Sequence, residues 1–92
     1  MATIYIPTPL RVFSNGKARV EVDAPQVTIS ELLSSLEEIC PGIRREMFDD
    51  FGALRRYLNI FVNSDHVRDI DGTGVRVVGD DEVYIIAAMA GG

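Results

Sequence analysis

One helix-like segment lies between runs of alternating apolar and polar residues, and this order strongly restricts the possible folds. The segment begins with a capping box, in which Thr28 and Glu31 bond each other's free backbone N–H groups. Apolar residues then recur at helical spacing up to Pro41-Gly42, at Ile29, Leu32, Leu33, Leu36, Ile39 and Cys40. One helix with a single apolar face predicts a sheet against which that face is buried.

Two strand-like runs precede the helix, at residues 3–6 and 18–23. Pro7 and Pro9 interrupt the first run. Since proline donates no ladder hydrogen bond, we expect the strand to bend or bulge there. The Asn15-Gly16 pair is typical of a two-residue hairpin turn, because a type I′ turn needs positive φ at both central positions. The chain is therefore predicted to open with a hairpin.

The segments after the helix are shorter and are separated by polar loops. We expect a further helical turn, a third strand, two short elements and a final strand, at residues 43–48, 56–63, 66–68, 75–78 and 83–87. With the hairpin and the helix, these predict an α+β fold, a mixed sheet with one main helix packed on one face. Residues 1–87 would form this single domain, and residues 88–92 a flexible C-terminal tail.

A docking surface is predicted from the alternation of the later strands. Phe61, Tyr84 and Ile86 alternate with aliphatic residues that would face the helix, so these three side chains should face away from it. An exposed aromatic and aliphatic cluster marks an interaction site, and we expect Arg11 to lie beside it. The alternative is that neighbouring loops cover these residues.

Size and charge exclude several classes of function. The chain has 92 residues and a net charge of −5, which suits a single small domain. Its arginines are scattered and form no basic stripe, so nucleic-acid binding is not expected. The longest apolar run, residues 83–90, is too short to cross a bilayer, and the N-terminal residues lack a signal-peptide pattern. We therefore expect a cytoplasmic protein without membrane partners.

Motifs for catalysis or metal binding are weak. Ser64-Asp65-His66 has the residue types of a catalytic triad, but adjacent side chains on a turn do not converge. Residues 69–80 match several positions of a calcium loop, yet they lack its final glutamate and its flanking helices. The single cysteine, Cys40, falls on the apolar face of the helix. The chain is therefore predicted not to be an enzyme and to hold no metal.

The last residues, Ala90-Gly91-Gly92, have no side chain larger than a methyl group. Two glycines cost conformational entropy in an ordered state and contribute no packing. They do allow the backbone to thread a narrow channel and to bring a terminal carboxylate to another protein's active site. The alternative interpretation is a frayed end, because disorder concentrates at termini.

Three parts of the sequence carry a family resemblance: residues 58–63 with Val67-Arg68, residues 79–83, and the Ala90-Gly91-Gly92 end. Over essentially its full length the chain resembles the MoaD/ThiS group of ubiquitin-like β-grasp sulfur carriers. Within that group, residues 6–11 and 52–56 are most similar to the carrier of actinobacterial-type cysteine synthesis.

The resemblance implies a specific reaction at Gly92. A ubiquitin-activating-type adenylating enzyme would use ATP to activate this carboxylate, which then becomes a thiocarboxylate. Ala90 and Gly91 would thread into the partner's channel, and no cofactor would be held by the chain itself. The sulfur acceptor would be a pyridoxal-phosphate (PLP)-dependent cysteine synthase. Two other interpretations stay open, a protein modifier conjugated through Gly92 and a non-covalent β-grasp adaptor.

Overall fold

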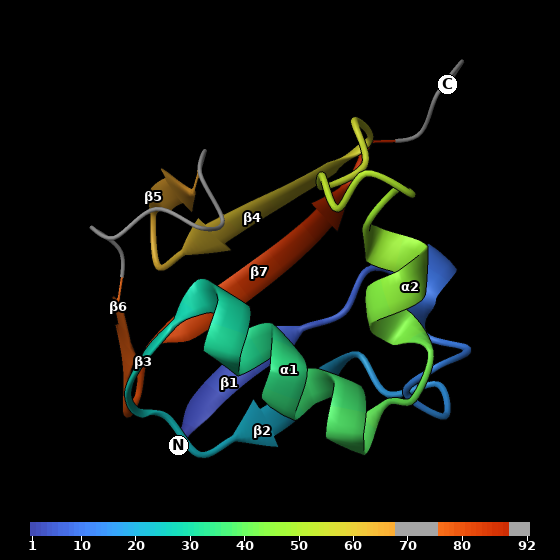
Figure 1. Cartoon of the computed structure of the whole chain (residues 1–92). Coiled ribbons are helices and arrows are strands. Elements are labelled where there is room, and N and C mark those ends of the chain that lie inside the picture. The colour runs from blue at the N-terminus through green and yellow to red at the C-terminus, as the bar shows by residue number, and fades with distance from the viewer. Residues whose placement is uncertain (68–75, 89–92) are drawn as a thin grey trace.

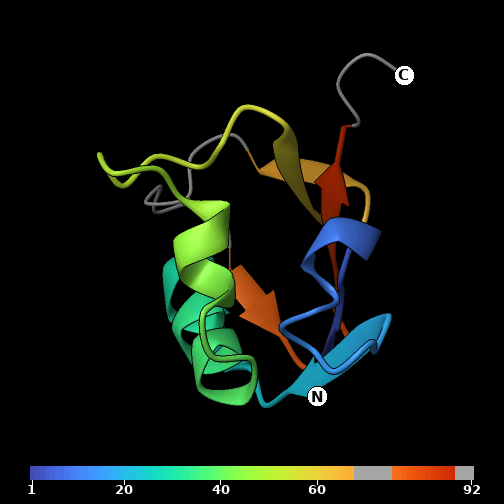
Figure 2. The same ribbon diagram turned by 90° about the vertical axis from the view of Figure 1, so that its right-hand side faces the viewer.

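A computed structural model describes residues 1–67 and 76–88, and it shows a main sheet with helices on one side (Figures 1 and 2). The main sheet has the strand order β2-β1-β7-β4-β5. Its strands are β1 (Ala2–Tyr5), β2 (Arg19–Val22), β4 (Leu58–Val62), β5 (Asp65–Val67) and β7 (Glu82–Ala87). The remaining elements are the 3-10 helix η1 (Thr8–Leu10), the strands β3 (Pro25–Thr28) and β6 (Arg76–Val78), and the helices α1 (Ile29–Ile39) and α2 (Ile43–Met47).

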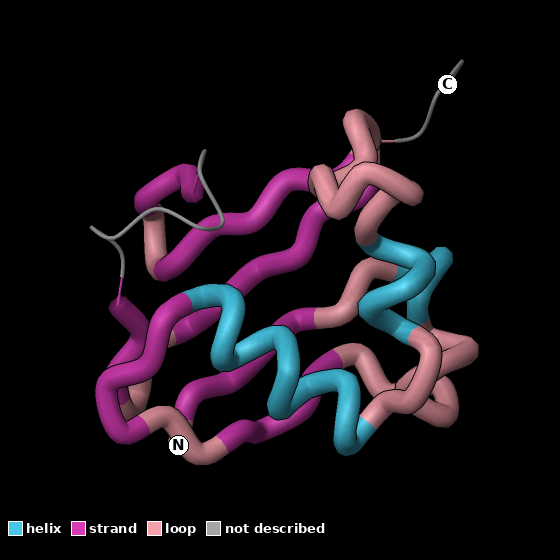
Figure 3. Tube along the Cα trace, viewed as in Figure 1, coloured by secondary structure: helices cyan, strands magenta, loops and turns pink. Residues whose placement is uncertain are grey.

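The sheet is mixed because its first and last strands lie side by side. β1 runs parallel to β7 and antiparallel to β2, whereas β7 is antiparallel to β4 and β4 to β5. Helix α1 crosses one face of this sheet (Figure 3). The predicted α+β architecture, a β-grasp sheet with one main helix on one face, is therefore confirmed. No helix within residues 1–67 and 76–88 has the length and apolar character needed to cross a membrane.

Helix α1 forms where the sequence predicts it, because its start is encoded locally. The Glu31 backbone N–H donates to Thr28 Oγ1 at 3.1 Å, and the Thr28 N–H donates to Glu31 Oε1 at 2.9 Å. Its buried face ends at Cys40, which is 1% exposed. Ile39, predicted to be buried, is instead 50% exposed, because it lies at the margin of the apolar face. Most of the predicted stripe is therefore correct.

The opening hairpin is confirmed, but its predicted two-residue connection is wrong. β1 ends at Tyr5, and Pro7 caps the 3-10 helix η1 instead of bending a continuing strand. The Asn15-Gly16 turn does form, with φ of 55° and 82°. It lies inside the long loop that follows η1. Proline ends the β1 ladder early because it has no N–H, and the loop absorbs the remaining residues.

Strands β3 and β6 form a separate two-stranded sheet that the sequence only partly indicates. The β6 segment was expected as a short element, whereas β3 was not predicted. It begins at Pro25, and its register with β6 shifts between Pro25 and Val27. Gln26 has a φ of 79° at this irregularity. A short, bulged strand that starts with proline gives no alternating pattern to recognise.

A polar clamp joins the β4–β5 turn to the start of β7. Asn63 has a φ of 54°, and its side-chain Oδ1 accepts from the Glu82 N–H at 3.0 Å. Its Nδ2 donates to Asp81 Oδ1 at 3.2 Å, while Asp81 Oδ2 accepts from the Val78 N–H at 2.9 Å. Asparagine tolerates this left-handed backbone well. Asn63 and Asp81, which lie in two of the segments that carry the family resemblance, therefore fix the register of the final strand.

Candidate docking face and start of the tail

The outer face of the main sheet, which is the face opposite α1, carries a row of large side chains. Strand register places Tyr5 opposite Arg19 and Tyr84, and Phe61 opposite Tyr84 and His66. The row therefore crosses all strands of the main sheet in the order Arg19, Tyr5, Tyr84, Phe61 and His66. These residues alternate with the buried residues of each strand, so the predicted outward orientation of Phe61 and Tyr84 is confirmed.

Two ring pairs organise this row. Tyr5 and Tyr84 stack with centroids 4.6 Å apart and an interplanar angle of 7°. Phe61 and His66 stack at 4.8 Å and 25°. The Tyr5 hydroxyl donates to a Glu82 carboxylate oxygen at 2.8 Å. Preorganised rings of this kind offer apolar area to a partner at little entropic cost.

The phenols of this row stay uncharged around neutral pH. The hydrogen bond from the Tyr5 hydroxyl to the Glu82 carboxylate raises the pKa of Tyr5. Desolvation raises the pKa of Tyr84. A partner that binds this face therefore contacts neutral phenol rings, with charged residues beside them, and not phenolate anions.

Ile86 extends this outer face toward the C-terminal end of β7. Its side chain is 46% exposed, which is high for a large aliphatic residue in a central strand. It faces Asn59 across the β4–β7 ladder, on the same side as Phe61 and Tyr84. The structure thus brings together the three residues that strand alternation predicts for a docking surface. Phe61 and Tyr84 are half-buried, and each stacks on a neighbouring ring of this face.

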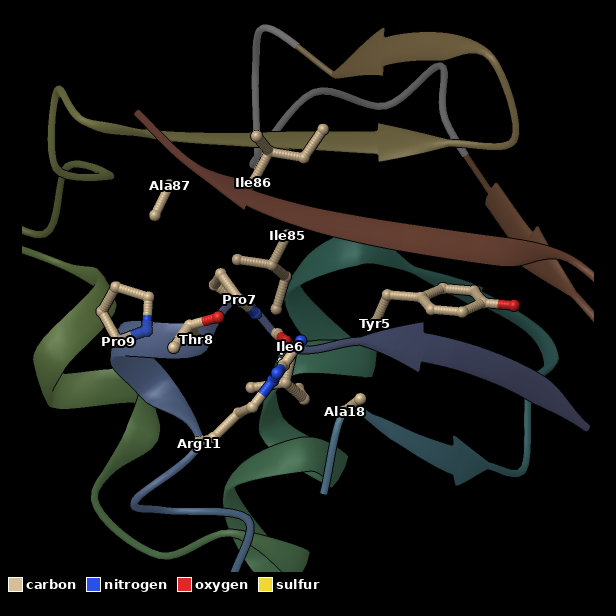
Figure 4. Close-up of a pocket in the computed structure, with 10 residues that line it drawn as sticks. All are labelled: Tyr5, Ile6, Pro7, Thr8, Pro9, Arg11, Ala18, Ile85, Ile86 and Ala87. Atoms are coloured by element: carbon tan, nitrogen blue, oxygen red, sulfur yellow. Dashed lines mark hydrogen bonds between the residues drawn. The ribbon is translucent and has the colours of Figure 1, made fainter. Parts of the chain in front are cut away.

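A groove of about 400 Å³ borders Ile86 and contains Arg11 (Figure 4). Residues 6–9 lie across from the end of β7 in this groove. The half-buried Arg11 donates from Nε to the Ile6 carbonyl oxygen at 3.0 Å, which fixes the loop after β1. Arg11 therefore lies beside Ile86, where the sequence analysis places it. The other lining residues are Tyr5, Pro7, Thr8, Pro9, Ala18, Ile85 and Ala87.

The tail starts beside this groove. Ala88 is the last described residue, and its N–H donates to the Tyr57 carbonyl oxygen at 2.7 Å, which prolongs the β4–β7 ladder. The predicted reactive and threading residues, Gly92, Gly91 and Ala90, lie outside the described residues. Four residues beyond Ala88 could span about 13–14 Å when extended. The candidate docking face and the start of the tail are therefore close together.

Tyr5 and His66 belong to the outer face but were not predicted. The alternation of Ile4, Tyr5 and Ile6 could have revealed Tyr5, since both neighbours are buried. His66 depends on the pairing of β5 with β4, which no local pattern indicates. Its Nε2 lies 3.1 Å from Asn59 Oδ1, and this contact accounts for its ring orientation.

Comparison with known proteins agrees with this geometry. The family model for ThiS matches residues 4–92. The sulfur carrier protein CysO of Mycobacterium tuberculosis is 35% identical, over 98% of this chain and 97% of that protein. A chain of the Amycolatopsis orientalis BexX/CysO complex superposes with a TM-score of 0.83 at 33% identity, and each of the two compared chains is covered completely.

A more distant likeness concerns the fold alone. The small archaeal modifier protein 1 of H. volcanii superposes with a TM-score of 0.73 at 20% identity, over 96% of this chain and 97% of that one. The two chains therefore share the ubiquitin-like β-grasp architecture.

Proposed function

Because the chain belongs to the ThiS family, we propose that it is a sulfur carrier whose Gly92 carboxylate is converted to a thiocarboxylate. The observation that carries this proposal is the extent of the family match, which runs through Gly91 to Gly92. The likeness to CysO proteins over nearly the whole chain supports the same function. The exposed Ile86 and the groove beside the start of the tail also support the proposal.

The reaction needs activation because a carboxylate shares its charge between two oxygens and resists nucleophiles. A partner enzyme of the ubiquitin-activating type would join the Gly92 carboxylate to the α-phosphate of ATP, which releases pyrophosphate. A sulfur nucleophile would then break the acyl–phosphate bond and release AMP. The carrier leaves with sulfur on Gly92. This use of ATP suits a cytoplasmic protein.

The chain would be a substrate of these enzymes rather than a catalyst. Within residues 1–67 and 76–88, no group of three or more His, Cys, Asp or Glu side chains could hold a metal ion. The buried Cys40 is also a poor sulfur donor, because desolvation raises the pKa of its thiol and disfavours the thiolate. The sulfur nucleophile must therefore come from another molecule.

We assign the docking role to Phe61, Tyr84, Ile86 and Arg11. The first three expose apolar area on the outer face, and the adjacent groove holds the half-buried Arg11. An enzyme bound here would receive the tail directly, because β7 carries Ile86 and ends at Ala87, just before the tail begins. Docking on a rigid sheet lets a few tail residues deliver Gly92, since Ala90 and Gly91 present no bulky side chains to a channel.

The likeness to CysO proteins favours cysteine synthesis as the destination of the sulfur. The acceptor would then be an activated serine derivative on a PLP-dependent cysteine synthase. That enzyme supplies the pyridoxal phosphate, and the adenylating enzyme supplies the ATP site. The carrier itself would hold no cofactor.

An exchange assay tests the activation step. The full chain is incubated with the adenylating enzyme from the same host, ATP and labelled pyrophosphate. We expect label to enter ATP with the intact chain but not with a variant that lacks Gly92. Val12→Ala, a change at a loop residue that is 77% exposed, is the matched control and should behave as the intact chain. Equal exchange with and without Gly92 would refute activation at this residue.

A further inference from the structure

Strand β2 leaves one edge of the main sheet unpaired by any described strand. β1 lies on its other side, and β2 stands at the end of the strand order (Figure 1). The Ile6 N–H donates to the Ala18 carbonyl oxygen at 2.8 Å, which defines the residues of β2 whose backbone faces β1. Antiparallel alternation then directs the N–H and C=O groups of Arg19 and Glu21 to the free edge.

A groove of about 400 Å³ borders this edge. The β2 residues, the turn before them and the end of α1 line it together. Ile39 contributes an aliphatic side chain that is 50% exposed, and Cys40 lies buried behind it. Val20 completes the apolar part of the lining from β2. The free edge therefore stands beside a recess that can accept an apolar side chain.

The rim of the groove is positively charged at one end. Lys17 and Arg19 line it, and both are exposed. The Lys17 charge is close enough to act on the Cys40 thiol, where it opposes the desolvation that raises the pKa of that group. Glu21 lies toward the other end of the same strand. In a chain of net charge −5, this local positive charge favours an acidic group on whatever binds here.

We propose that β2 accepts an extended peptide segment of a partner protein as an additional strand. The peptide backbone pairs with the free N–H and C=O groups of Arg19 and Glu21. An apolar peptide side chain enters the groove against Ile39, and an acidic residue at its flank contacts Lys17 and Arg19. Strand addition of this kind takes its affinity from the main chain and its specificity from the adjoining pocket. The site does not depend on the proposed function of the tail.

The test uses the full ¹⁵N-labelled chain and a synthetic peptide, Asp-Asp-Val-Ile-Val-Ile. We expect chemical-shift changes and slowed amide exchange at Arg19 and Glu21, together with shift changes at Ile39. A peptide with lysines in place of the aspartates should bind more weakly, and one with a central proline should not pair. If the peptide causes none of these changes, the charged residues of β2 only protect the edge from pairing. That result would overturn the proposal.

Two variants and a matched control locate the site. Arg19→Pro removes one edge donor, which an edge strand tolerates, and should weaken binding about threefold to tenfold. Ile39→Asp places a charge in the groove at an exposed position and should also weaken binding. Val12→Asp, at a loop residue outside the groove, should not.

Other occupants give different results. Changes confined to Phe61, Tyr84 and Ile86 would mean that the peptide occupies the outer face. Changes at the β2 amides on concentrating the protein alone would mean that a second copy pairs with this edge. Either result would overturn the assignment.

Discussion

Shortening Ile86 to alanine should weaken docking to the adenylating enzyme while the fold is kept. Ile86 is 46% exposed in the free protein, so a partner can remove just under half of its surface from water. Complete burial of an isoleucine side chain contributes about 1.5–3 kcal/mol. The exposed share then corresponds to about 0.7–1.4 kcal/mol, which raises the Kd about threefold to tenfold.

The same substitution also lowers the stability of the free protein. The buried share of Ile86 corresponds to about 0.8–1.6 kcal/mol of the free energy of unfolding. Val78→Ala provides a matched control, because Val78 is 43% exposed but lies on β6, outside the main sheet. Thermal unfolding of both variants shows that the protein remains folded at the temperature of the binding assay.

Isothermal titration of the adenylating enzyme with each variant measures the change in Kd. We expect Ile86→Ala to weaken binding by the calculated amount and Val78→Ala to leave the Kd unchanged. Equal effects of the two substitutions, or none from Ile86→Ala, would refute the assignment of the outer face as the docking surface.

Three further predictions concern the tail, the core and acid stability. Gly91→Val should slow thiocarboxylate formation by about a hundredfold, because a displaced reacting group costs that much; mass spectrometry measures the rate. Leu36→Ala should lower the free energy of unfolding by about 2–5 kcal/mol in urea, since Leu36 is completely buried. Hydrogen bonds from the Gly42 and Arg44 N–H groups lower the pKa of Glu37 from 4.5. The ionised Glu37 side chain therefore stabilises the folded protein fully above that pH. This stabilisation is lost as the pH falls through the folded pKa, and Glu37→Gln should flatten this loss in acid unfolding curves.

Each of these predictions has a control and a contradicting result. Ala53→Val enlarges an exposed loop residue and should leave the thiocarboxylation rate unchanged; equal rates for Gly91→Val would contradict threading. Glu38→Ala, on the exposed side of α1, should cost far less stability than Leu36→Ala. Acid curves of identical shape for the wild type and Glu37→Gln would show that its hydrogen bonds contribute nothing.

The sequence predicts those features that depend on nearby residues. Helix α1 is correct at its start because Thr28 and Glu31 are three residues apart and cap each other. The outward orientation of Phe61 and Tyr84 is also correct, since strand alternation fixes it as soon as the inner face is known. Local patterns therefore give the main helix and the predicted residues of the outer face.

Features that join distant segments could not be predicted in the same way. The groove beside Ile86 forms between residues 5–11 and the end of β7, and no pattern within either segment shows that they meet. The pairing of β3 with β6 likewise joins Pro25 to Val78. The two-residue hairpin was a wrong prediction because the ladder stops before Pro7, which the turn residues alone do not reveal.

Intact-mass measurement of the protein purified from its native host tests the central claim most directly. We predict a species in which one oxygen is replaced by sulfur, with fragmentation placing the exchange at Gly92. A carboxylate that stays unmodified during active sulfur assimilation would contradict the account. A ladder of higher-mass conjugates linked through Gly92, without the sulfur-containing species, would contradict it equally and identify a protein modifier instead.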